Sequence, residues 1–389
     1  MSPRTLQFSA HSPYRRLVGV GGIGTGLFFA LEGEHTLGRN ESRPARLLNI
    51  RDYCKLHIIS HYIAVLLGAE PSGSPFHVVP VGKVGGDDAG RRMIKEMAVV
   101  GMDTQYVDIL QDKPTLLSVC FQYPGGSGGN VTTSESAASA LTPSDVDRCA
   151  ELLASGDSRS IALAAPEVPI ETRDRLLKLA EGHHAFRAAS FTSSEILMAR
   201  REGMFSHVDL LAMNEDEAGM LVGMTFDAAN AQAFLDRCAD TLRSYQPHIQ
   251  VIVSAGKEGA FAFADGTWDH CPAASVPVVS TAGAGDALLA GVLSALAVGM
   301  PFIRPGPVRA SFSDRPLESA FDFGALLAAY TVTSPHTIHP DANLDALLSF
   351  GHKLRATFSY EMMRFTSPSF CSDENAQCGA VAKPQYSRS

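Results

Sequence analysis

The sequence predicts an α/β fold, in which a doubly wound, mainly parallel sheet carries helices on both faces and a small β-lid lies beside it. Short apolar runs, such as 17–20 and 250–254, alternate with segments of helical periodicity, such as 88–100. Alternation of this kind is typical of βαβ units. The apolar fraction of 45% is also sufficient for a large buried core.

The elements follow one another along the chain. Each expected strand is a short run rich in Val, Ile, Leu or Ala, and each expected helix is longer and ends near Gly or a polar segment. A helix capped by Asp52 is expected to end at Gly68. The expected strands are 17–20, 76–81, 160–164, 207–213 and 250–254, and the expected helices are 52–67, 88–100, 170–180, one from about 214, 286–298 and 317–332.

Two polar or glycine-rich stretches interrupt this order, about 27–53 and 112–136. We expect them to leave the main sheet and to pair as the lid. The domain is predicted to span 15–358, and 359–389 is predicted to be a disordered tail because its periodicity is lost. Exposed lid edges could pair between subunits, so a homodimer through the lid is a further expectation.

Composition indicates which kinds of partner and which cellular compartment are expected for this protein. The net charge of −9 disfavours nucleic-acid binding. No uninterrupted apolar run reaches the ~18 residues that a membrane-spanning helix needs. The seven cysteines are odd in number and form no C-x-x-C pair. Reduced thiols in a cytoplasmic protein are therefore expected.

The most informative segment is Thr281-Ala-Gly-Ala-Gly-Asp286, directly before an almost wholly apolar helix. Small residues let the backbone approach a ligand, and N–H groups at a helix N-terminus stabilise an anion. A carboxylate at the mouth of such a cradle is suited to taking a proton from an alcohol, as phosphoryl transfer requires. A glycine-rich turn that only caps a buried helix is the alternative.

This segment resembles the D-T-x-G-A-G-D motif of the ribokinase-like, or PfkB, carbohydrate kinases. The resemblance implies a ribokinase-like fold, ATP and Mg²⁺ as cofactors, and Asp286 as the catalytic base. It also implies that the backbone of Ala282, Gly283, Ala284 and Gly285 forms the anion hole. Ser280 replaces the first Asp, which helps to hold a monovalent cation in many members, so the resemblance does not extend to cation activation.

Further motifs of the family occur in the expected order between about 17 and 345. Asn214-Glu-Asp-Glu217 resembles the N-x-x-E motif, which implies a phosphate contact for Asn214 and a magnesium-organising role for Glu217. Acidic residues in the first turn of a helix are favourable in any protein, which is the simpler explanation. The resemblance also implies a nucleotide-binding loop with Ser254, Gly256 and Gly259. It further implies that Glu167 contacts the phosphoryl acceptor.

The acceptor side departs from the family. Gly26 stands where many members carry an Asp that binds sugar hydroxyls, and 54–59 lacks the G-G-x-x-x-N motif. Arginines between Arg39 and Arg51, with Arg43 and Arg46 at the centre, are either a solvated face or a recognition site for an anionic acceptor. The sequence therefore predicts transfer of the γ-phosphate of ATP to an alcohol group of a sugar, nucleoside or related small molecule, without specifying which.

Other functions compete with this hypothesis. Gly19-Val-Gly-Gly-Ile-Gly24 matches the dinucleotide fingerprint of NAD-dependent oxidoreductases, although no helix or acidic strand end is expected to follow. A ligand-binding regulator with weakened catalysis is a second alternative. His57 and His61 have zinc-binding spacing, but packed histidines are favoured. Gly125–Gly129 contains G-x-S-x-G in a loop, where a nucleophile elbow is not expected.

Overall fold

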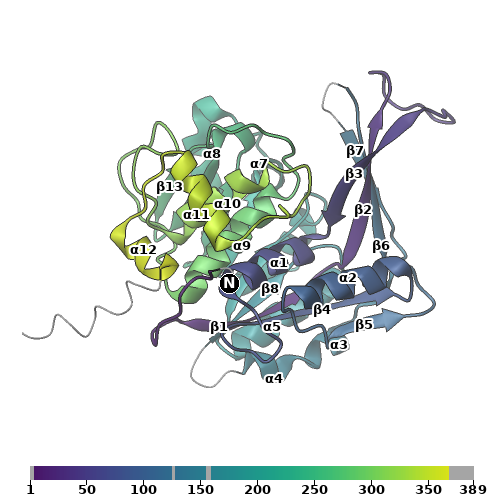
Figure 1. Ribbon diagram of the computed structural model, residues 1–389, viewed down its shortest axis with the longest axis horizontal. Coiled ribbons are helices and arrows are strands. Elements are labelled where there is room, and N and C mark those ends of the chain that lie inside the picture. The colour runs from purple at the N-terminus through teal and green to yellow at the C-terminus, as the bar shows by residue number, and fades with distance from the viewer. Residues whose placement is uncertain (1–3, 125–127, 155–158, 368–389) are drawn as a thin grey trace, which may run out of the picture.

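The main body of the protein is built on one nine-stranded sheet. The computed structural model describes residues 4–124, 128–154 and 159–367. The strand order is β13-β12-β11-β10-β9-β8-β1-β4-β5, parallel from β11 to β5, with β12 and β13 antiparallel at one edge (Figure 1). The mainly parallel sheet predicted from the sequence is confirmed. The strands are β1 Tyr14–Val20, β4 His77–Gly85, β5 Val107–Leu110, β8 Arg159–Ala164, β9 Phe186–Ser190, β10 Leu210–Asn214, β11 Gln250–Ser254, β12 Ala260–Ala264 and β13 Thr267–Cys271.

Helices cover both faces of this sheet. Alternate residues of a strand point to opposite faces, so Leu17 joins the core beneath α1, α9 and α10 while Val18 joins the core beneath α5. Burial on both faces explains why these strands are continuous apolar runs. The helices are α1 Lys55–Leu67, α2 Asp88–Val99, α3 Pro143–Asp147, α4 Ala150–Leu153, α5 Ile170–Gly182, α6 Ile196–Arg201, α7 Glu215–Val222, α8 Ala231–Arg243, α9 Ala284–Val298, α10 Ala320–Thr331, α11 Leu344–Lys353 and α12 Tyr360–Thr366, with short 3₁₀ turns at Ala137–Ala140, Met204–His207, Ala228–Asn230 and Gly256–Glu258. In the part of the chain that the structure describes, none of these helices has the length and hydrophobicity to cross a membrane.

A second sheet, the lid, projects from the body at upper right in Figure 1. Its order is β3-β2-β6-β7, built from β2 Gly24–Leu31, β3 Ala45–Tyr53, β6 Leu116–Gln122 and β7 Gly128–Thr132. The two segments predicted to leave the main sheet therefore pair with each other. Because β3 continues to Tyr53, the following helix begins at Lys55, and the predicted start at Asp52 is wrong. Gly68 ends α1 with a left-handed φ of 64°, as predicted.

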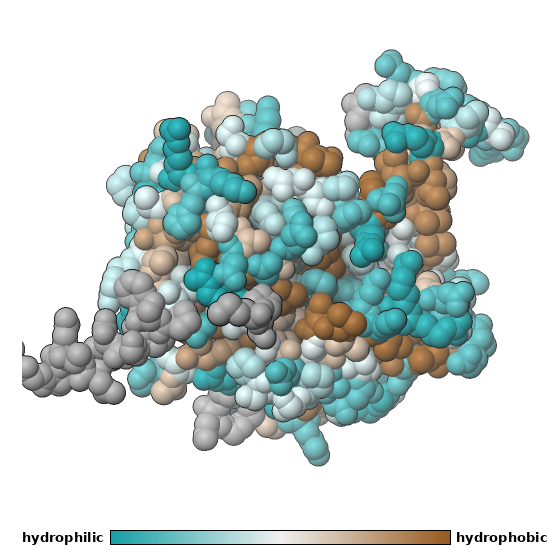
Figure 2. Space-filling model, viewed as in Figure 1, coloured by the Kyte–Doolittle hydropathy of each residue, from teal (hydrophilic) through white to brown (hydrophobic). Residues whose placement is uncertain are grey.

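Part of the lid surface is apolar. Figure 2 shows brown side chains along the lid, and Leu27, Leu47 and Val131 are exposed there. Leu27 and Val131 are both paired with Val119, so they lie in one row across β2, β6 and β7. Such a row is the kind of surface on which a lid-to-lid dimer would form, and the dimer itself stays a prediction.

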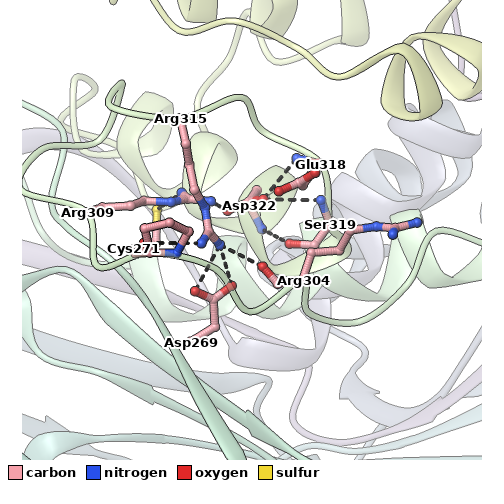
Figure 3. A network of polar contacts seen from close by, with 9 residues as sticks. Asp269, Cys271, Arg304, Arg309, Arg315, Glu318, Ser319 and Asp322 are labelled. Carbon is pink, nitrogen blue, oxygen red and sulfur yellow. Dashed lines mark hydrogen bonds and ion pairs between the residues drawn. The ribbon is translucent and has the colours of Figure 1, made fainter.

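A buried ionic network fixes the segment that precedes α10 (Figure 3). Arg309 donates to Asp322 at 2.5 Å, and both side chains are almost fully buried. Arg315 donates to both carboxylate oxygens of Asp269, at 2.8 and 2.9 Å. The network joins the loop to β13 and α10, and α10 packs along α9. It therefore supports the helix that carries Asp286.

The end of the described chain corrects the tail prediction. Ser359 caps α12, and Met362 of this helix is buried. Leu317 and Phe358 form an isolated bridge just before it. The prediction of disorder from 359 onward is therefore wrong for α12, and 368–389 lie outside the described residues.

Candidate active site

Asp286 lies in the first turn of α9, a helix that is apolar on nearly all sides and packs between α1 and α10. Gly283 caps this helix with a left-handed φ of 81°. A Cβ at Gly283 would overlap the carbonyl oxygen of Thr337 and lie 3.1 Å from its carbonyl carbon. Only glycine fits this position, because any side chain would be both strained and obstructed.

The turn before Asp286 divides its N–H groups into two sets. The N–H of Ala282 donates to Ser280 Oγ at 3.2 Å, and that of Ala284 donates to the Thr281 carbonyl at 3.3 Å. Within the described chain, the N–H groups of Gly283 and Gly285 have no such partner. The helix N-terminus thus presents two free donors beside Asp286, an arrangement able to stabilise an anion.

A cavity of 650 Å³ brings most of the predicted site together. Its walls combine polar groups from β10, β11 and α9 with apolar residues from α10 and from the loop after β13. A cavity of this volume suits a small-molecule ligand. The predicted site residues that line it are Asn214, Glu217, Ser254, Gly256, Gly259, Gly283, Ala284, Gly285 and Asp286.

The predicted nucleotide loop follows β11. Ser254 ends the strand, and its hydroxyl lies 3.7 Å from where a Cβ of Gly285 would be. Gly256 and Gly259 have positive φ values of 49° and 89°. A Cβ at Gly259 would lie 2.6 Å from the backbone nitrogen of Ala273. These glycines allow the loop to turn tightly against the neighbouring chain at the cavity wall.

Asn214 and Glu217 form a reciprocal cap at the start of α7. Asn214 Oδ1 accepts the Glu217 N–H at 2.8 Å, and Glu217 Oε2 accepts the Asn214 N–H at 2.9 Å. The N-x-x-E pattern therefore has a structural role as a capping box. Oε1 of Glu217 is outside this cap and lies 3.6 Å from Lys55 Nζ.

Lys55 is a site residue that the sequence reasoning missed. It is the first residue of α1, its side chain lines the cavity, and its backbone N–H donates to Glu167 Oε2 at 3.3 Å. Burial alone would lower the pKa of Lys55, but the charges of Asp286, Glu217 and Glu167 together outweigh burial and raise it. The ammonium is therefore charged, and it lines the same cavity as Asp286. The only signal in the sequence was a cation at the start of a helix, inside the stretch that departs from the family.

Asp286 and Glu167, two acidic groups that interact with Lys55, have raised pKa values. Burial raises the pKa of Asp286, Glu217 adds to the effect, and Lys55 opposes it. Burial likewise raises the pKa of Glu167 to about 7, with the Cys54 thiol and Lys55 opposing and Asp286 reinforcing the shift. Glu167 also has a positive φ of 75°. Raised pKa values and backbone strain are typical of functional sites.

Gly26 lies on β2 directly opposite Asp52 of β3. Asp52 was interpreted from the sequence as a helix cap, so its place next to Gly26 was also missed. Burial raises the pKa of Asp52 to about 6, and the charge of Asp286 contributes in the same direction. A carboxylate of the lid strand β3 is therefore within electrostatic reach of Asp286.

The predicted arginine contacts lie elsewhere. Arg43 is in the hairpin between β2 and β3, where it donates to Glu41 at 2.8 Å and to the His35 carbonyl at 2.7 Å. Arg46 is exposed on β3, paired with Ala30 near the same hairpin. In Figure 1 this end of β2 and β3 points away from α9. The structure does not bring Arg43 or Arg46 together with Asp286.

The rival sites do not have the required surroundings. Gly24 begins strand β2, not a helix, so the 19–24 segment lacks the context of a dinucleotide fingerprint. Burial lowers the pKa of His57 to about 3 and that of His61 to about 4, as expected for packed neutral histidines. No cluster of three metal-binding side chains occurs within 4–124, 128–154 and 159–367. Residues 125–127 of the G-x-S-x-G match lie outside those ranges.

Comparisons with known proteins agree with this geometry. The bifunctional ribokinase/ribose-5-phosphate isomerase A of Fructilactobacillus sanfranciscensis is 25% identical over 274 residues, 69% of this chain and 47% of that protein. The chain thus matches about half the length of this relative. Deoxyribokinase of Salmonella typhimurium is 26% identical over 272 residues, 67% of this chain and 77% of the relative.

Solved structures show the same fold. Ribokinase from Cryptococcus neoformans var. grubii serotype A, in complex with ADP, aligns with a TM-score of 0.64 and 18% identity, over 86% of this chain and 99% of that chain. The family model described as pfkB family carbohydrate kinase matches residues 62–343, which is most of the chain. The protein therefore belongs to the pfkB family of carbohydrate kinases.

Proposed function

We propose that this protein transfers the γ-phosphate of ATP to a hydroxyl group of a sugar, nucleoside or related small molecule. The observation that carries the proposal is the position of Asp286, a half-buried carboxylate in the first turn of α9 at a cavity of 650 Å³. Lys55 and the N-terminus of α9 supply positive potential to the same cavity. A base next to positive potential is the arrangement that phosphoryl transfer needs.

The chemistry follows from these groups. Asp286 accepts the proton of the acceptor hydroxyl while the oxygen of that hydroxyl bonds to the γ-phosphorus of ATP. At the same time the bond between the γ-phosphorus and the bridging oxygen breaks, and ADP leaves with that oxygen. The raised pKa of Asp286 makes it a stronger base than an ordinary aspartate. Lys55 and the N–H groups of Gly283 and Gly285 stabilise the charge on the transferred group.

Residues of the same cavity also support the proposed binding of the nucleotide and of magnesium. Asn214, Ser254, Gly256 and Gly259 line the part of the cavity proposed for ATP. Oε1 of Glu217, which takes no part in the cap of α7, supplies a carboxylate oxygen there. Mg²⁺ in such enzymes is held by one or two carboxylates and the phosphates, and it neutralises phosphate charge.

Asp286→Asn is the direct test. Formation of ADP from ATP is measured with D-ribose, D-fructose and inosine as acceptors, and binding of ADP is measured by calorimetry. Loss of a general base is expected to lower turnover about 10²–10⁴-fold while ADP still binds. Asp216→Asn, which removes an exposed carboxylate from α7, is the matched control. Unchanged turnover in Asp286→Asn would remove this residue as the base, and ATP binding without turnover in the wild type would favour a regulator.

A further inference from the structure

Gly26 and Asp52 are complementary in shape. They are paired residues of the antiparallel strands β2 and β3. A Cβ at Gly26 would overlap Asp52 Oδ2 and would lie 2.8 Å from Asp52 Cγ and 3.0 Å from its Cβ. The carboxylate of Asp52 thus occupies the space that a side chain from β2 would otherwise fill. The glycine on β2 is what allows a carboxylate from β3 to reach this place.

Asp52 is held firmly in this position. The Tyr53 N–H donates to the Thr337 hydroxyl at 3.2 Å, and both groups act on the Asp52 carboxyl in the direction that lowers its pKa, against the effect of burial. The hydroxyl of Thr25 donates to its carbonyl oxygen at 3.2 Å, and the guanidinium of Arg92 donates to that hydroxyl at 2.8 Å. The backbone on both sides of the carboxylate is therefore fixed, as expected for a group that positions a ligand.

The surroundings of Asp52 define the chemistry of what it can bind. The charge of Asp286 acts on Asp52, and the charges of Asp52, Glu167 and Asp286 all act on the thiol of Cys54. These mutually interacting groups come from β3, the loop after β8, the first turn of α9 and the start of α1. They comprise three carboxyl groups, the thiol and the ammonium of Lys55, and Glu167 also interacts with the charge of Arg173. Away from Lys55 and the N-terminus of α9, the charge of Asp52 disfavours an anionic group, and carboxylate oxygens accept hydrogen bonds from hydroxyl groups.

We propose that Asp52 is a substrate-binding residue that accepts hydrogen bonds from hydroxyls adjacent to the reacting one, and that the acceptor is a neutral polyol. This inference rests on the proposed function and narrows the class of phosphoryl acceptor to uncharged compounds. It replaces the anionic acceptor expected from Arg43 and Arg46, whose guanidinium groups lie toward the far end of the lid.

The first test compares acceptors. Rates of ADP formation are measured with MgATP and either neutral D-ribose, D-fructose and inosine or the anionic D-ribose 5-phosphate and D-gluconate. Binding of each compound is measured in parallel by calorimetry with ADP present. We expect at least one neutral polyol to bind and none of the anions to bind more tightly. Preference for an anion, or no binding of any neutral polyol, would overturn the proposal.

The second test uses Asp52→Asn, which keeps the shape of the side chain. With the best neutral polyol we expect the KM, or the Kd if there is no turnover, to rise about tenfold or more, while ADP binding is unchanged. Because binding is measured directly, a wild type that binds the polyol but forms no ADP would refute the proposed kinase activity and still test Asp52. An unchanged acceptor constant in Asp52→Asn would refute the role of Asp52.

The decisive test moves the carboxylate between strands. Gly26→Asp alone should lose acceptor binding, since the new side chain would overlap Asp52. Asp52→Gly should also lose it, and the double variant Gly26→Asp/Asp52→Gly should recover a large part of the loss. ADP binding and thermal unfolding confirm that each variant is folded. A folded double variant with no better acceptor binding than Asp52→Gly would contradict the proposal.

Discussion

The ammonium nitrogen of Lys55 lies 3.6 Å from Oε1 of Glu217, across the cavity that Asp286 also lines. Glu217 is fixed by the cap of α7, so the lysine pairs with a carboxylate whose position is already set. The charge of Lys55 also opposes the rise in the pKa of Asp286. One cation thus connects the proposed base with the proposed magnesium-organising carboxylate.

Lys55→Met is expected to lower kcat/KM about 10²–10³-fold, because it removes a cation placed where negative charge develops. The measurement is the rate of ADP formation with the best acceptor from the panel above. Lys178→Met is the matched control, since Lys178 pairs with Asp174 on the surface of α5. Equal rates for Lys55→Met and this control would show that Lys55 has no part in transfer.

Gly283→Ala is expected to reduce both stability and turnover. Gly223 has a similar φ of 69° but nothing within 4 Å of an added Cβ, whereas Gly283 faces the carbonyl of Thr337. Gly223→Ala should therefore lower the free energy of unfolding by only about 1 kcal/mol, the cost of left-handed backbone. Denaturant unfolding should show a larger loss for Gly283→Ala. Equal losses would mean that the contact with Thr337 imposes no constraint.

Arg309→Met should be strongly destabilising, because it leaves the buried carboxylate of Asp322 without its partner (Figure 3). Breaking a buried ion pair costs about 3–5 kcal/mol of unfolding free energy. Arg304→Met removes an arginine from a partly exposed pair with Glu361 and should cost less than about 1 kcal/mol. Chemical denaturation of the two variants measures both values. A loss of less than about 1 kcal/mol in Arg309→Met would contradict the expected role of this pair.

Glu167→Gln should change how stability depends on pH. The folded protein holds the proton of Glu167 up to about pH 7, whereas the ordinary pKa is 4.5. Since the folded state binds the proton more tightly, the contribution of Glu167 to stability falls as pH rises from about 4.5 to about 7 and is constant above. Thermal unfolding is measured at pH 5, 6, 7 and 8. As the pH rises through this range, the stability of Glu167→Gln should increase relative to that of the wild type. Glu171→Gln, exposed on α5, is the control, and a parallel trend in both variants would count against this explanation.

Local sequence signals were sufficient to predict some of the residues that line the candidate site. The glycine-rich turn, Asp286 and the start of α7 each depend on neighbours within a few residues, so short motifs predicted them. Lys55 and Asp52 depend on how β3 pairs with β2 and packs against Thr337, which no local pattern encodes. Asp52 also satisfies the usual preference for a helix cap, and this local fit concealed its place in a strand.

The same distinction explains the fold. Strands buried on both faces, such as β1 and β11, were predicted from continuous apolar runs. In contrast, β9 (Phe186–Ser190) contains a buried arginine paired with Asp209, and β3 contains two arginines, so neither has the composition of a core strand. Tertiary pairing determined these elements, in agreement with the general context dependence of strand formation.

The three carboxyl groups of the proposed site, Asp52, Glu167 and Asp286, lie on segments far apart in the chain. Each reaches its place only after a different part of the molecule has formed: the lid, the loop after β8 and the packed helix α9. Long-range parallel pairing of this kind forms slowly compared with local helix. During refolding, acceptor binding should therefore return later than helical circular dichroism, and a ribosome-bound chain should stay inactive until α9 has emerged.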